Sequence, residues 1–134
     1  MQNNSDEGRA YYEAGKTYMI NPIQKIVYIE YDNKIAKENL AGESSLSVNS
    51  LLTEPKIQTV AVYKGDEVAK NLQEIDPKWA GDKKLLKVEF WKYNPELFAI
   101  DGSVDPASLA ASLSNEADER VQGELNDYLE EYKW

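Results

Sequence analysis

A short helix with small residues, followed directly by a β-branched run, most constrains how this chain folds. Residues 40–52 have helical spacing, and the helix must end before Pro55. One face of it collects Ala41, Ser45, Val48 and Leu52. Small side chains on that face allow the helix backbone to lie close to a sheet. Residues 57–63 are apolar on both alternating faces, so the sequence predicts a helix docked on a central strand.

Further strands and helices are predicted on both sides of this pair. Residues 23–31 are dense in β-branched and aromatic residues and are a predicted strand. Residues 83–93 alternate between an apolar face and a charged and aromatic face and are also a predicted strand. Helices are predicted over 8–20, over 67–74 after the cap Asp66, from Asp105-Pro106 onward, and after Asn115 as the cap of a last helix.

These elements predict one α+β domain over residues 8–134, with residues 1–7 as a disordered tail or a severed linker. The length of 134 residues is that of a single domain. We expect a small mixed β-sheet of about three to five strands that is covered by helices. The predicted core consists of Val27, Ile29, Val60, Val62, Val88, Phe90, Leu109, Leu125 and Leu129.

The composition excludes several classes of function. The chain has no cysteine and no histidine, which removes disulfides, thiolate chemistry, the usual general base and the commonest metal ligand. Its net charge is −9, and residues 101–134 hold nine acids against Arg120 and Lys133. We therefore expect no direct binding of nucleic acid. We also expect a cytoplasmic protein without membrane contact, because no apolar span and no signal peptide are evident.

The first candidate site lies at the start of the predicted helix over 40–52. There, backbone N–H groups could bind an anionic ligand, as glycine turns at helix starts do. The alternative is a tight connection in which small residues serve only close packing. The candidate ligand-binding residues are Gly42, Glu43, Ser44 and Ser45.

A metal site for nucleotidyl transfer would need two or three carboxylates on one face of the following strand. Residues 57–63 contain none, and Asp66 just after them is explained as a helix cap. We therefore predict no catalytic residue, no metal ligand and no cofactor.

The second candidate site is a partner surface on the predicted strand over 83–93. Alternation places Leu86, Val88 and Phe90 toward the core and leaves the aromatic residues 91 and 93 on the opposite face. Large aromatic rings away from the core need cover, either from the tyrosine-rich helix over 8–20, which we favour, or from a second molecule. The candidate residues are Tyr11, Tyr12, Lys87, Trp91 and Tyr93.

Several packing and turn motifs resemble those of one bacterial group. They are Asn21-Pro22-Ile23-Gln24-Lys25, the stretches 40–46 and 52–59, Tyr93-Asn94-Pro95, the stretch 104–109, and Asp118-Glu119-Arg120-Val121. The chain resembles the C-terminal domain of uncharacterised bacterial proteins in which a MarR-type winged-helix module commonly comes first. It is also loosely similar to abortive-infection type IV antitoxins, and this resemblance implies, by analogy, a degenerate nucleotidyltransferase-like core.

The sequence and the resemblance together favour a non-enzymatic function. We expect an interaction or effector domain of a bacterial transcriptional regulator or antitoxin-like protein, acting through protein contact or a small ligand. Its partner would be another protein or its own upstream DNA-binding module, and the domain itself would be a monomer or a weak homodimer. The alternative is a nucleotidyltransferase-related enzyme that uses Mg²⁺ and a nucleotide through Asp66, Glu67 or acids near Asp101.

Overall fold

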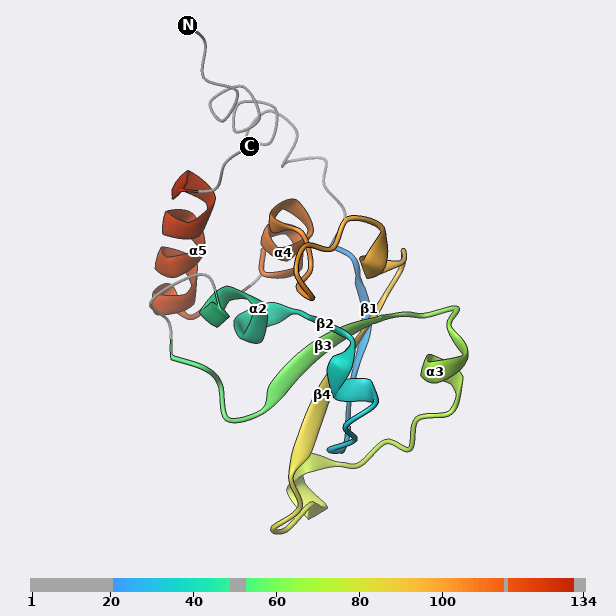
Figure 1. Cartoon of the computed structure of the whole chain (residues 1–134). Coiled ribbons are helices and arrows are strands. Elements are labelled where there is room, and N and C mark those ends of the chain that lie inside the picture. The colour runs from blue at the N-terminus through green and yellow to red at the C-terminus, as the bar shows by residue number, and fades with distance from the viewer. Residues whose placement is uncertain (1–20, 49–52, 115, 132–134) are drawn as a thin grey trace, which may run out of the picture.

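A computed structural model of the chain describes residues 21–48, 53–114 and 116–131. Within these residues, four strands form one mixed sheet in the order β1-β4-β3-β2 (Figure 1). The strands are β1 (Ile23–Glu30), β2 (Asn39–Leu40), β3 (Gln58–Tyr63) and β4 (Leu85–Trp91). β4 pairs antiparallel with β1 and parallel with β3, and β2 is antiparallel to β3. This confirms the predicted α+β class.

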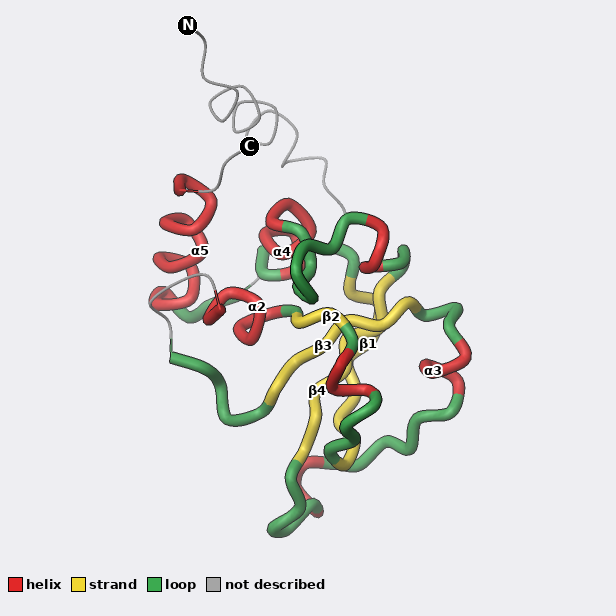
Figure 2. The backbone as a smooth tube through the Cα atoms, in the orientation of Figure 1, coloured by secondary structure: helices red, strands yellow, loops and turns green. Residues whose placement is uncertain are grey.

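Helices and short 3₁₀ turns connect the strands. The α-helices are α2 (Gly42–Val48), α3 (Glu67–Lys70), α4 (Pro106–Ser112) and α5 (Glu119–Glu131). The 3₁₀ turns are η2 (Ile35–Lys37), η3 (Pro77–Trp79) and η4 (Pro95–Leu97). Figure 2 shows that the connection from β3 to β4 is mostly loop, and α3 is its only α-helix within the described residues. The predicted helix over 8–20 and the end of the helix predicted over 40–52, residues 49–52, lie outside the described residues.

Helix starts follow the predicted capping chemistry. The Val68 N–H donates to Asp66 Oδ1 at 3.1 Å, and the Ser108 N–H donates to Asp105 Oδ2 at 3.0 Å. α3 ends four residues before the predicted position, because the chain beyond it runs along β1 and donates a bond from Ile75 N to the Tyr28 carbonyl at 2.7 Å. Asn115 lies outside the described residues, and α5 begins only at Glu119.

The sheet has an apolar core on each face. α2, α4 and α5 lie on one side of the sheet and α3 on the other (Figure 1). The α3 side buries Val27, Ile29, Val60, Val62, Leu86 and Val88. The other side buries Leu46, Ala61, Trp91, Leu109, Val121, Leu125 and Leu129, among others. The predicted core is confirmed except for Phe90, which is only half-buried.

The placement of Trp91 on a partner surface is wrong. Its side chain is fully buried, in the cluster that α4 and α5 also build. The ring of Tyr93 meets it edge-on, with centroids 5.6 Å apart, and is half-buried, as is Lys87. Strand alternation correctly separated the two faces, but helices later in the chain cover the second face. Tyr11 and Tyr12 lie outside the described residues.

A tight hairpin extends the sheet beyond β2. Ile100 and Ser103 exchange two backbone hydrogen bonds, of 2.9 and 3.0 Å, around Asp101 and Gly102. Both of these turn residues have positive φ, 50° and 77°, as the type I′ turn of a two-residue hairpin requires. The hairpin is bound to Leu40 by two more backbone bonds, from Leu40 N to the Gly102 carbonyl and from Val104 N to the Leu40 carbonyl.

Candidate functional site

The start of α2 packs directly against the sheet at Gly42. Gly42 has a φ of 54°, and a Cβ there would lie 3.4 Å from Glu89 Oε2 and 3.5 Å from Thr59 Cγ2. A side chain at this position would be strained by the positive φ, which explains the glycine, and its Cβ would be in ordinary van der Waals contact with these two atoms. α2 is therefore held directly on β3 and β4.

The hydroxyl groups of α2 are used inside the protein. The Thr59 N–H donates to Ser44 Oγ at 2.8 Å, and Ser45 Oγ is hydrogen-bonded to Ser103 Oγ. Both serines are buried, as is Gly42, and only Glu43 is half-exposed among the four predicted ligand-binding residues. The structure thus favours the close-packing alternative over anion binding for this stretch.

Strand alternation places Glu89 on the same face of β4 as Trp91, and the structure buries its carboxyl group. Its side chain lies between β4 and the start of α2, with 3% of its surface exposed. The Trp91 Nε1–H donates to its Oε1 at 3.0 Å. Burial raises the pKa of Glu89 above the ordinary 4.5, whereas the Trp91 bond and the charge of Lys87 act in the opposite direction. The environment of Glu89 therefore favours the neutral acid.

This single carboxyl does not make a metal site. Ala61 lies beside Glu89 in the parallel register, and Thr59 is the other β3 residue near it, so β3 contributes no acid. Across the described residues, no group of three or more acidic side chains is placed to hold a metal ion. Asp66, a candidate of the enzymatic alternative, caps α3. Nothing in the described part of the chain assembles the carboxylate set of nucleotidyl transfer.

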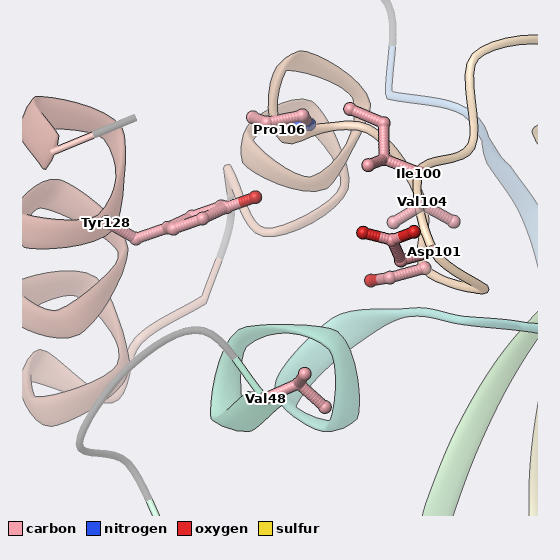
Figure 3. Close-up of a pocket in the computed structure, with 7 residues that line it drawn as sticks. Val48, Ile100, Asp101, Val104, Pro106 and Tyr128 are labelled. Atoms are coloured by element: carbon pink, nitrogen blue, oxygen red, sulfur yellow. The ribbon is translucent and has the colours of Figure 1, made fainter. Parts of the chain in front are cut away.

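A pocket of about 190 Å³ lies where α2, α4, α5 and the hairpin meet. Figure 3 shows its labelled side chains converging from these separate elements, with the Asp101 carboxylate and the Tyr128 hydroxyl directed toward the same space. Among the described residues, its lining is formed by Val48, Ile100, Asp101, Ser103, Val104, Pro106 and Tyr128. The sequence analysis missed this pocket. We call it the Asp101 pocket.

Large apolar side chains are exposed beside this pocket. Leu97 and Phe98, at the end of η4, are 65% and 64% exposed. Backbone bonds from Leu97 N to the Asn94 carbonyl and from Ala99 N to the Glu96 carbonyl hold the turn. Ile100, at 45%, continues the exposed run into the pocket wall. We call Leu97 and Phe98 the η4 surface.

Comparison of the chain with protein-family models, curated proteins and solved structures found no match. In the described part of the chain, no helix combines the length and the apolar character that crossing a membrane requires.

Proposed function

We propose that this chain is a non-enzymatic interaction or effector domain of a bacterial transcriptional regulator or antitoxin-like protein. The observation that carries the proposal is the η4 surface, which presents two large apolar side chains to solvent from a hydrogen-bonded turn. Exposed apolar patches of this kind are typical of protein contact sites. A partner that covers Leu97 and Phe98 would remove their apolar surface from water.

The structure around η4 supports a contact with little reorganisation. Asn39 Nδ2 donates to Glu96 Oε2, which ties the turn to the buried end of β2. The cap of the turn is also formed, because the Glu96 N–H donates to Asn94 Oδ1 at 2.9 Å. A surface already held in one conformation loses less conformational entropy on binding.

The resemblance to MarR-associated C-terminal domains supports the regulatory context of the proposal. The net charge of −9 disfavours contact of this domain with DNA. It therefore favours an arrangement in which an upstream module binds DNA and this domain binds protein.

The proposal is tested by cross-linking the tagged chain to its partners in bacterial cells and identifying them by mass spectrometry. We expect one protein to be recovered with the wild-type chain and lost with the double variant Leu97→Ser/Phe98→Ser. The matched control is Trp79→Ser, because Trp79 is an exposed apolar residue, at 83%, in the separate turn η3. Equal recovery by all three chains, or no specific partner for any, would contradict the proposal.

The enzymatic alternative is tested separately. Titration of the purified chain with Mg²⁺ and ATP, followed by NMR, should leave the signals of Asp66, Glu67 and Asp101 unchanged. Saturable shifts there would favour a nucleotidyltransferase-related function instead.

A further inference from the structure

The Asp101 pocket has the size and walls of a small-molecule site. Its walls are largely apolar, with Val48, Ile100, Val104 and Pro106 around the ring of Tyr128. An apolar cavity of roughly 150 Å³ is enough to hold a benzene-sized molecule. The pocket, with about 190 Å³, therefore has room for a compact apolar body.

Of the described residues that line the pocket, Asp101 alone is charged, and its carboxylate faces this apolar space (Figure 3). The hairpin fixes its backbone through the Ile100 and Ser103 bonds and the two bonds to Leu40. In the described part of the chain, no side chain or N–H group donates a hydrogen bond to this carboxylate, and none forms an ion pair with it. The backbone of Asp101 is thus held in place, and its exposed carboxylate is available to a ligand.

The charge around the pocket selects a cation. Among the residues that the structure describes, no lysine or arginine lines it, and residues 101–134 of the sequence carry nine acids against two basic residues. Such a field repels anions and concentrates cations. A neutral ligand would cover Asp101 without pairing it, which is unfavourable for a carboxylate.

We propose that the Asp101 pocket binds a small organic ammonium compound. The ammonium group donates to the Asp101 carboxylate, and the apolar body lies between Val48, Ile100 and Tyr128. This goes beyond the protein contact proposed above, because it concerns a ligand of defined chemistry and is tested without any partner.

The test is an NMR titration of the ¹⁵N-labelled full chain with benzylammonium, with benzyl alcohol as the neutral probe of the same shape. We expect saturable shifts at residues 100–104 and 128, and binding of benzyl alcohol weaker by about tenfold or more, the loss of one charged hydrogen bond. Absence of saturable shifts, or equal affinity for the two probes, would overturn the proposal.

Variants separate the pocket from the general acidity of the chain. Asp101→Asn should weaken benzylammonium binding by about tenfold or more, and asparagine tolerates the positive φ of this turn position. Asp82→Asn removes the same charge from an exposed turn before β4 and should leave binding unchanged. Val48→Lys places a competing cation at the exposed pocket rim and should abolish binding. Equal weakening by Asp101→Asn and Asp82→Asn, or undiminished binding to Asp101→Asn or to Val48→Lys, would refute the site.

Discussion

Replacement of Trp91 by phenylalanine tests the buried centre of the structure. Trp91 is fully buried and donates its indole N–H to Glu89 Oε1. The smaller phenylalanine ring loses apolar contact worth about 1 kcal/mol. It also leaves the buried Glu89 oxygen without this donor, which costs about 1–3 kcal/mol. We therefore expect Trp91→Phe to lower the free energy of unfolding by about 2–4 kcal/mol, the sum of these two effects.

The stability lost in Trp91→Phe should grow as the pH rises. Burial raises the pKa of Glu89 above 4.5, and the bond from Trp91 lowers it in part. Without this donor, the pKa in the folded variant is higher still, so the folded variant keeps its proton to a higher pH. Below pH 4.5 the carboxyl is protonated in the folded and unfolded states of both proteins. Stability falls as pH rises from 4.5 through the raised pKa, and it falls further in the variant.

The assay is urea unfolding followed by far-ultraviolet circular dichroism at pH 4.5 and pH 7. The matched control is Trp79→Phe, because Trp79 is 83% exposed, and we expect it to change stability by less than about 0.5 kcal/mol. A loss below about 1 kcal/mol for Trp91→Phe would be less than the ring burial and the lost donor together require. A loss independent of pH would refute the coupling between Trp91 and the ionisation of Glu89.

Three further predictions concern stability and DNA. Leu125→Ala should lower the free energy of unfolding by about 2–5 kcal/mol in denaturant melts, because Leu125, on α5, is buried in the core between α5 and the sheet. A loss below about 0.5 kcal/mol would mean that α5 does not pack there. Gly42→Ala should destabilise the protein by about 1–2 kcal/mol because Gly42 has a positive φ. Gly123→Ala, inside α5 with open space around it, should stabilise the protein by about 0.5–1 kcal/mol. Equal effects of the two substitutions in thermal melts would contradict the backbone argument. The chain should not shift duplex DNA in gels at physiological salt, and a salt-dependent shift would overturn the charge argument.

Local chemistry was sufficient to predict most of the elements from the amino-acid sequence. The predicted strands over 23–31, 57–63 and 83–93 became β1, β3 and β4, and Asp66 and Asp105 cap the helices as expected. These features depend on neighbours a few residues apart, so spacing and residue type determine them. Strand alternation also assigned Val88 correctly to one face of the sheet and Trp91 to the other.

Only the tertiary structure decided what covers each face. Nothing near Glu89 in the sequence shows that α2 lies over its carboxyl, and the partner surface predicted at Trp91 was wrong because α4 and α5 return to that side of the sheet. The Asp101 pocket likewise joins Val48 and Tyr128, which are eighty positions apart in the numbering. Burial and pockets depend on contacts between distant segments, and these contacts follow from the path of the whole chain rather than from the periodicity of any one stretch.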